Sequence, residues 1–461
     1  DQDRLAIVVA SDDRAARDLA AALRVWLEPR VVRYYPSRGV TYESHLAPPP
    51  HLVGLRIAAL DGLAEDGDTA PVVVVSAVAL SEKVPDPSMR PHGFELRVGE
   101  LLDLDETAMD LVSAGYEHVD QVEDRGQFAI RGGLLDVFPA TEDRAVRVDL
   151  FGDEIESLRW FSTFTQRSLG DAEVVEVAPA AELAQEHREL AEIAALEDEA
   201  DRPDIAELLP VENFHPFLKL VPGDATVLIA GDEEVAPVLA DHWQDVTAAF
   251  HDEDAHHLYV GPEEIAATLN ERARIRLSSL DQDQRFTFRA QTADVAARGL
   301  KEAEPELEKL ERSGYRPVVT FARRGEGERA AYNLGRLKVR WLGEDDADGT
   351  APRGAITFAN ARLATGFIAP QFHLAVIPDH RLFRRRREPV QRERRRGVLR
   401  SFADLRTGDI VVHEDHGLAR FAGFDTKTVA GVTRDYLYLE YAGSDRVFVP
   451  VDQLAKISRY V

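Results

Sequence analysis

The stretch that decides the fold of the C-terminal region is TGDIVVHEDHGLARFAGFDTKTVAGVTRDYLYLEYAGSDRVFVPVDQL, residues 407–454, which is followed by AKISRY. Polar and apolar residues alternate in Asp409–Val412, Arg434–Tyr441 and Arg446–Val449, and glycines separate these runs. Such alternation predicts short antiparallel strands with one buried face. We therefore expect a small β-barrel here, a kind of module that usually binds and rarely catalyses.

Two blocks of the sequence resemble one known family. The runs VVHEDHGLARFAG and RDYLYLEYAGSDRVFVPVDQL are similar to the RNA polymerase-interacting domain of the bacterial transcription-repair coupling factors, and CarD-type regulators share a looser version. Residues Gly115–Pro139, GYEHVDQVEDRGQFAIRGGLLDVFP, and the following VDLFGDEIESLRWFSTFTQRS resemble the UvrB-like module of the same family. In that family this module recruits the damage sensor UvrA.

Length and composition indicate a multidomain protein. A chain of 461 residues is long enough for three or four domains. It has no cysteine, so disulfides and thiolate metal sites are excluded, and no apolar run approaches the roughly 20 residues of a membrane span. The net charge of −27 argues against broad binding of nucleic acid, although a salt-adapted or GC-rich source would also explain it. We expect a cytoplasmic fragment whose upstream part is missing.

The N-terminal region predicts a parallel α/β sheet. Leu5–Ala10, Val31–Tyr35 and Val72–Val75 are aliphatic enough for buried strands, and helices are expected between them at Arg14–Leu27, with Ser11 as N-cap, and at Leu52–Gly62. Prolines 48–50 interrupt this pattern. The cluster at Pro85–Pro91 indicates a domain boundary.

Beyond that boundary the pattern predicts an α+β insert, with strands at Phe94–Val98, Phe128–Arg131, Leu134–Phe138 and Ala145–Phe151. The α/β pattern resumes with a helix at Ala181–Ala200, a strand at Thr226–Ala230 and a helix at Pro262–Arg274, and a further small α/β domain follows. The expected divisions are 1–88 and 178–285 for the first α/β domain, 89–177 for the insert, 286–381 for the small domain, 382–400 for a basic linker and 401–461 for the barrel. The family resemblance implies a degenerate RecA-like α/β domain, a UvrA-binding insert and a C-terminal Tudor- or SH3-like barrel.

Several short motifs resemble catalytic or metal sites, and none of them has the residues that such a site requires. No glycine is followed by lysine, so the Walker A loop that holds nucleotide phosphates is missing, and Gly231-Asp232-Glu233-Glu234 is expected to be a polar loop. His413-Glu414-Asp415-His416 is one residue short of the zinc-protease spacing, and a Gly417 turn is expected after it. Glu344–Gly349 resembles a calcium loop, but its twelfth position is Ala355. We expect no catalytic residue, metal or cofactor in this chain, and the resemblance implies that ATP and Mg belong to a translocase module that lies beyond it and contacts DNA.

The resemblance to the UvrA-docking surface implies that Arg147, Arg159 and Phe161 are contacts. Arg131 and Arg167 are weaker candidates, because either could be an internal partner of Asp136 or Asp153. Arginines beside an exposed aromatic ring are typical of interface hot spots. A solvated strand face with Phe161 in the core is the alternative interpretation.

In the last domain, DYLYLEY places Leu437 and Leu439 on one face of a strand and Tyr436 and Tyr438 on the other. The resemblance implies that these four residues bind the β subunit of RNA polymerase. A strand with apolar or aromatic residues on both faces is either central to a barrel or an edge to which a partner can add a strand. Ordinary barrel packing is the alternative.

Together these features predict an adaptor that binds stalled RNA polymerase and recruits UvrA to start nucleotide excision repair. The alternative is a CarD-like transcription regulator without a repair role. A nuclease or helicase proper would need a nucleotide or carboxylate-metal motif that the sequence lacks.

Overall fold

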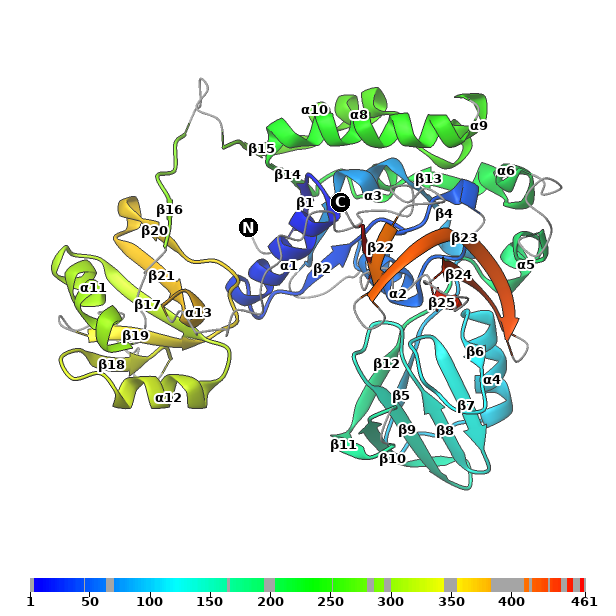
Figure 1. Ribbon diagram of the computed structural model, residues 1–461, viewed down its shortest axis with the longest axis horizontal. Helices are drawn as coiled ribbons and strands as arrows, with labels where there is room; N and C mark the ends of the chain where they lie inside the picture. Colours follow the sequence, from blue (N-terminus) through cyan, green and yellow to red (C-terminus); the bar gives the residue numbers. More distant parts are fainter. Residues whose placement is uncertain are drawn as a thin grey trace. The chain divides into compact units, whose positions relative to one another are not determined.

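The computed structural model (Figure 1) describes residues 4–44, 46–63, 70–163, 166–194, 204–250, 252–279, 286–293, 300–343, 355–382, 410–413, 417–429, 432–440, 446–450 and 457–459. Contacts divide the chain into two compact units, Asp1–Phe383 and Arg384–Val461, which are described separately. Within the described residues, none of the helices is both long and apolar enough to cross a membrane.

A parallel sheet forms the first part of the larger unit. Its strand order is β15-β14-β1-β3-β2, and every pairing is parallel. The strands are β1 (Ala6–Ala10), β2 (Val32–Tyr35), β3 (Val72–Ser76), β14 (Thr226–Ala230) and β15 (Ala273–Leu277), and the helices associated with them are α1 (Asp13–Trp26), α2 (Pro50–Asp61), α3 (Ala77–Ser81), α8 (Asp232–Ala249) and α10 (Pro262–Arg272). Strand β3, which lies between β1 and β2, is buried along its whole length, as expected for an aliphatic strand with both faces covered.

The insert lies between β3 and β14 in the sequence and has a six-stranded sheet of its own, in the order β11-β10-β9-β8-β7-β6 (Figure 1). Its strands are β6 (Glu117–His118), β7 (Gln127–Arg131), β8 (Leu134–Val137), β9 (Ala145–Phe151), β10 (Glu154–Phe161) and β11 (Ser168–Ala172). The β6–β7 pairing is parallel and the others are antiparallel. One face packs on helix α4 (Leu104–Ser113) and on the antiparallel pair β5 (Phe94–Arg97) and β12 (Val174–Val177).

Short elements connect the insert with the parallel sheet. They are the antiparallel pair β4 (Lys83–Pro85) and β13 (Phe214–Pro216), helices α5 (Gln185–Ala194), α6 (Ile205–Leu208), α7 (Phe217–Leu220) and α9 (Asp252–Leu258), and the 3-10 turns η1 (Tyr42–Ser44), η2 (Pro87–Met89) and η3 (Val211–Asn213). Their shared core is aromatic, because the ring of Tyr42 meets those of Phe214 and Tyr259 edge-on.

A third sheet completes the larger unit, with the order β16-β20-β21-β17-β19-β18. Its strands are β16 (Gln291–Thr292), β17 (Arg316–Phe321), β18 (Lys338–Trp341), β19 (Ala355–Asn360), β20 (Phe367–Ala369) and β21 (Leu374–Pro378), with α11 (Leu300–Arg312), α12 (Arg324–Tyr332), α13 (Asp379–Leu382) and η4 (Pro370–Phe372). Strands β21, β17, β19 and β18 pair in parallel. Helix α12 approaches Trp341 so closely that a Cβ on Gly327 would lie 2.4 Å from its ring.

The smaller unit is an antiparallel sheet with the order β25-β24-β23-β22-β26. Its strands are β22 (Ile410–His413), β23 (Gly417–Val429), β24 (Val432–Glu440), β25 (Arg446–Pro450) and β26 (Ile457–Arg459). The predicted antiparallel strands are confirmed. Closure of the sheet into a barrel stays a prediction, because the described pairings leave β25 and β26 at the two ends of the order.

Two local predictions are wrong. Asp12, not the buried Ser11, caps α1, because its carboxylate accepts a hydrogen bond of 2.8 Å from the Ala15 amide. Gly231 precedes a helix, not a polar loop: the acidic residues that follow it form the first turn of α8, where carboxylates complement the helix dipole. The interruption expected at prolines 48–50 is met in part: Pro48 and Pro49 lie outside helices and strands, and Pro50 is the first residue of α2. Gly417 begins β23 and pairs with His413 at the end of β22, so the chain reverses between these two residues, as expected for a turn at this point.

Other predictions are met in part or lie outside the description. The helix expected at Ala181–Ala200 is described only as α5, Gln185–Ala194. Of the predicted linker 382–400, only Leu382 is described, as the last residue of α13. The acidic loop Glu344–Gly349 and residues 414–416 of the His-Glu-Asp-His motif lie outside the described residues.

Candidate partner-binding surfaces

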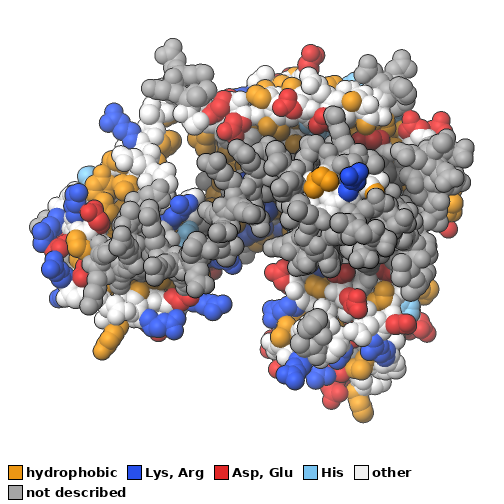
Figure 2. All heavy atoms as spheres, in the orientation of Figure 1, with side chains coloured by type: hydrophobic (Ala, Val, Ile, Leu, Met, Phe, Trp, Pro, Cys, Tyr) orange, Lys and Arg blue, Asp and Glu red, His pale blue; other side chains and the backbone are white. Residues whose placement is uncertain are grey.

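One face of the insert sheet collects most of the predicted contact residues. Along β9, Val146 and Val148 enter the core against α4, so Arg147 and Asp149 point to the opposite face. Arg147 lies opposite Asp136 of β8 and opposite Arg159 of β10. Arg131 is on the same face, at the end of β7. Figure 2 shows basic and acidic side chains interspersed over the visible side of the insert, at the lower right.

Arg147 is held from several sides. Its guanidinium donates two hydrogen bonds of 2.7 Å to the two oxygens of Asp136 and one of 3.1 Å to Gln166 Oε1. It also lies 4.7 Å from the centre of the Phe161 ring. The hydrogen bonds with Asp136 raise the pKa of Arg147. Asp136 is thus the partner of Arg147, whereas the sequence had suggested Arg131 or Arg167 for it.

Phe161 itself is not available to a partner. Its side chain is 2% exposed and packs with Val122, Ala129 and Ala145 in a small core on this face. The predicted alternative, Phe161 in the core, is the one that the structure shows. The guanidinium of Arg147 lies over its ring, and the ring has little exposed surface for a direct contact with a partner protein.

The remaining predicted arginines are more accessible. Arg159 is 43% exposed and donates a hydrogen bond of 3.0 Å from Nε to Asp149 Oδ2. Arg131 is exposed and donates to the backbone carbonyl of Asp120 at 3.1 Å. Arg167 is exposed beside the Gln166 turn, where Gln166 has a φ of 58°.

Phe151 belongs to this face and was missed in the sequence. It is the last residue of β9, four residues after Arg147, and its side chain is 78% exposed. An exposed ring at the edge of an arginine-rich face is the composition of an interface hot spot. The strict alternation Ala145, Arg147, Asp149, Phe151 was the signal that could have identified it.

In the smaller unit, Leu439 is fully buried, which favours a packing role over direct contact with a partner. Leu439 lies opposite Phe421 and Val447, and Phe421 is 1% exposed. Tyr436, Leu437 and Tyr438 lie in β24, paired with Pro450, Val449 and Phe448 of β25. Their side chains are outside the description, so their predicted contacts stay predictions.

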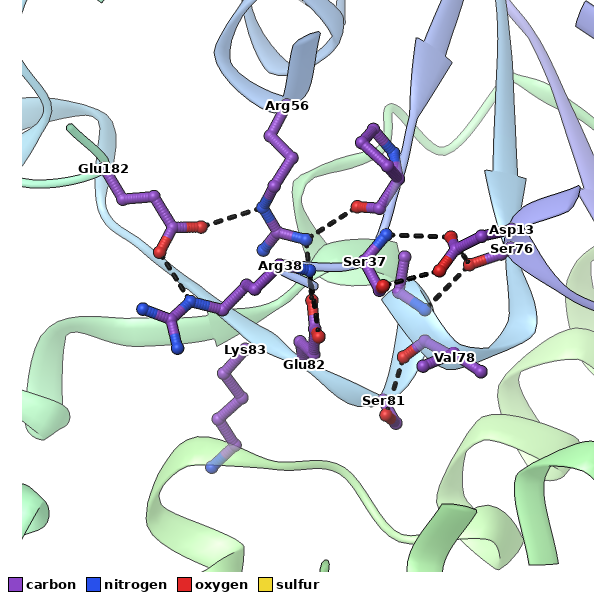
Figure 3. Close-up of polar contacts among 12 residues, drawn as sticks. Asp13, Ser37, Arg38, Arg56, Ser76, Val78, Ser81, Glu82, Lys83 and Glu182 are labelled. Carbon is purple, nitrogen blue, oxygen red and sulfur yellow. Dashed lines mark hydrogen bonds and ion pairs between the residues drawn. The ribbon is translucent and has the colours of Figure 1, made fainter. Parts of the chain in front are cut away.

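Ligands of parallel α/β sheets, nucleotides included, bind at the carboxyl ends of the strands. There, Asp13 follows β1 at the start of α1, and its carboxylate accepts hydrogen bonds from the Ser37 amide at 2.9 Å and the Ser76 hydroxyl at 2.7 Å (Figure 3). After β14, Asp232 forms an ion pair with Arg276, and Glu233 accepts a hydrogen bond of 2.8 Å from the Ser279 amide. These carboxylates are thus engaged with the chain itself. No group of acidic and histidine side chains suited to a metal ion is found among the described residues.

A buried cluster of four charges lies beside this edge (Figure 3). Arg56 of α2 donates to Glu82 at 2.6 Å and to Glu182 at 2.8 Å, and Glu182 also accepts from Arg38 at 2.6 Å. Glu82 in turn accepts from the Arg38 amide at 3.0 Å. The four side chains are between 1% and 11% exposed. They connect three parts of the α/β domain with the segment that follows the insert.

The two carboxylates of this cluster differ electrostatically. Burial raises the pKa of Glu82 to about 7, since the loss of water outweighs the attraction of Arg56 and Arg38. Glu182 is hydrogen-bonded by both guanidinium groups, and together these hold its pKa below the ordinary value despite burial. The arginines also lie over aromatic rings, with Arg56 4.5 Å from the centre of Tyr35 and Arg38 3.7 Å from that of Tyr42.

Comparison with protein families matches two parts of the chain. Residues 94–183, which contain the whole insert sheet, match the UvrB interaction domain. Residues 405–461, which contain the whole antiparallel sheet of the smaller unit, match the CarD-like/TRCF RID domain. The resemblance to the transcription-repair coupling factor family is confirmed.

Transcription-repair-coupling factors from several bacteria are similar to nearly the whole chain. That of Myxococcus xanthus is 31% identical over 98% of this chain, that of Bacillus subtilis 26% over 94%, and that of Escherichia coli 28% over 84%. The chain spans only 43%, 41% and 37% of these three relatives. Like the transcription-repair coupling factors, it combines a UvrB interaction domain with a polymerase-interacting domain.

Proposed function

We propose that this chain is the adaptor region of a transcription-repair coupling factor, which binds stalled RNA polymerase and recruits UvrA to start nucleotide excision repair. The observation that carries the proposal is the insert face: Arg131, Arg147 and Arg159 lie on one side of a sheet within the matched UvrB interaction domain, with the exposed Phe151 at its edge. Arginines and an exposed ring together suit a protein partner.

The UvrA contact surface consists of Arg131, Arg147, Arg159 and Phe151, with Arg167 nearby. Phe161 is replaced by Phe151 as the aromatic contact, because the ring of Phe161 has almost no exposed area. Asp136 and Asp149 balance the charges of Arg147 and Arg159, so these two ion pairs add no net charge to the face. Donors that are fixed within neutral pairs favour recognition of one surface over attraction to any acidic one.

The second contact is the β subunit of RNA polymerase, bound by the RID domain through β24 and its neighbours. Support comes from the matched domain and from the antiparallel sheet that contains Tyr436, Leu437 and Tyr438. Leu439 serves the interior of that sheet. We propose that the sheet closes into a Tudor- or SH3-like barrel.

We further propose that the first α/β domain is a degenerate RecA-like domain without ATP turnover. The supporting feature is the carboxyl edge of its sheet, where Asp13 binds Ser37 and Ser76 of this chain. ATP, Mg and DNA are assigned to translocase domains outside this chain, and the protein to the cytoplasm. The domain divisions 1–88 with 178–285, 89–177, 286–381, 382–400 and 401–461 belong to the same proposal.

Binding of the chain to separately immobilised UvrA and RNA polymerase β subunit tests the adaptor role. Binding to both partners is expected, with Arg147→Ala reducing only the UvrA signal. Binding to polymerase alone would favour the CarD-like regulator. Binding to neither partner would overturn the proposal.

A further inference from the structure

Two arginines of the insert face are directly opposite each other across neighbouring strands. Arg147 of β9 pairs in register with Arg159 of β10. Like charges in this position repel and destabilise a sheet. The structure resolves the conflict by giving each guanidinium its own carboxylate: Arg147 binds Asp136 on one side, and Arg159 binds Asp149.

The two carboxylates fix the directions of the arginine side chains. Asp136 is 5% exposed, and its two oxygens accept two parallel hydrogen bonds of 2.7 Å from the guanidinium of Arg147. This fork geometry restricts the guanidinium in angle as well as in distance. Asp149 accepts from Arg159 at 3.0 Å and from the Ser157 hydroxyl at 2.9 Å, so its own carboxylate is fixed too.

A free arginine side chain loses much conformational freedom when a partner immobilises it, and this loss weakens binding. A side chain already held in its bound direction loses less. The exposed fractions of 23% for Arg147 and 43% for Arg159 leave part of each guanidinium open to a partner while its carboxylate holds it.

We propose that Asp136 and Asp149 are positioning residues of the docking face, which hold Arg147 and Arg159 ready for UvrA. The inference rests on the proposed function and adds residues to it that need not touch the partner. In this role the two aspartates strengthen UvrA binding, although their negative charges reduce the positive charge of the face.

The inference can be tested because positioning and simple charge attraction predict opposite effects on UvrA affinity when these negative charges are removed. Asp136→Asn and Asp149→Asn each raise the net charge of the face by one unit. Glu156→Gln is the control, because it makes the same change of charge at an exposed carboxylate of β10 beside Ser157. If UvrA were attracted by net positive charge, all three variants would bind it at least as tightly as the wild type. If the aspartates position the arginines, the two Asp→Asn variants bind about tenfold more weakly, whereas Glu156→Gln binds normally.

The measurement is the dissociation constant of the full chain for immobilised UvrA, with thermal unfolding recorded for each variant. Asp149→Asn keeps the test valid if Asp136→Asn fails to fold, because the side chain of Asp149 is 20% exposed. A combined Asp136→Asn, Arg147→Ala variant distinguishes positioning from loss of fold: with Arg147 absent, the Asp136 change should have no further effect on affinity.

The outcomes separate this inference from the proposed function. If the wild type binds UvrA and Arg147→Ala weakens binding, but both Asp→Asn variants bind as tightly as Glu156→Gln, the inference is overturned and the proposed function stands. If Arg147→Ala, Arg159→Ala and Phe151→Ala all leave UvrA binding unchanged, the docking face is wrong and the inference is overturned, although a chain that binds both partners is still an adaptor. If the wild type binds neither UvrA nor the polymerase β subunit, the proposed function is overturned as well.

Discussion

Removal of the Glu182 carboxylate should destabilise the larger unit severely. In the wild type, the buried charges of Arg38 and Arg56 are balanced by Glu82 and Glu182. Glu182→Ala leaves two guanidinium groups with one carboxylate, at a place where Arg56 is 1% exposed and water cannot replace the lost partner. The side chain of Glu182 is 11% exposed, so solvent screens the pair only slightly.

The expected loss in the free energy of unfolding is about 3–5 kcal/mol, the usual result of removing one partner from a buried ion pair. Domains of this kind are stable by about 5–15 kcal/mol, so the variant should unfold at much lower urea concentration. Hydrogen exchange adds a local test: amides of α2, which carries Arg56, should lose protection more than those of the third sheet.

The matched control is Glu186→Ala in α5, four residues along the chain. Its carboxylate is 77% exposed beside His187, so its removal should change the free energy of unfolding by no more than about 0.5 kcal/mol. Equal urea midpoints for Glu182→Ala and the wild type would refute the reasoning, because Glu182 would then contribute nothing to the free energy of unfolding.

Three other expectations concern the same molecule. Phe151→Ala should weaken UvrA binding and leave thermal unfolding nearly unchanged, whereas Phe161→Ala should cost about 3–5 kcal/mol of stability; the reverse pattern would restore Phe161 as the contact. Because burial raises the pKa of Glu82 to about 7, its ionisation in the folded state opposes folding, and the stability it contributes in the protonated form is lost as the pH rises from about 4.5 to about 7. The free energy of unfolding of Glu82→Gln relative to the wild type should therefore increase across this range, and a flat difference would show that Glu82 titrates normally. Tyr438→Arg, on the face of β24 opposite to the buried Leu439, should reduce binding to the polymerase β subunit without shifting the unfolding midpoint, while Leu439→Arg should prevent folding of the sheet; normal binding by a folded Tyr438→Arg variant would exclude this position.

The sequence predicted strands better than it predicted partners for side chains. Val72–Ser76 and Ala145–Phe151 were found almost to the residue, because period-two alternation and continuous aliphatic runs depend on the local chain alone. Exposure of an aromatic ring also depends on what covers each part of a sheet face. Phe161 and Phe151 lie on the same face of neighbouring strands, and only the packing of Phe161 with Ala129 and Ala145 shows that it is the buried one.

Ion pairs were harder still to predict. Asp136 and Arg147 are 11 residues apart, and their contact follows from the register of β8 and β9, which the sequence does not fix. Glu182 and Arg56 are 126 residues apart, with the whole insert between them. Nothing in their local sequence distinguishes them from solvated charges, which is the usual condition of glutamate and arginine.

Helix α2 makes long-range contacts with both the insert and the segment that follows it. A Cβ on Gly54 would lie 2.9 Å from that of Ala140 in the insert, and His51 lies 3.3 Å from the Ala140 carbonyl. Two residues beyond Gly54, Arg56 binds Glu182, where the chain leaves the insert. The helix therefore contacts the insert at the turn between β8 and β9 and binds its exit segment through a buried charge. Since β8 and β9 carry Asp136 and Arg147, α2 joins the sheet of the docking face to the α/β domain through close packing and a charge pair that water cannot easily replace.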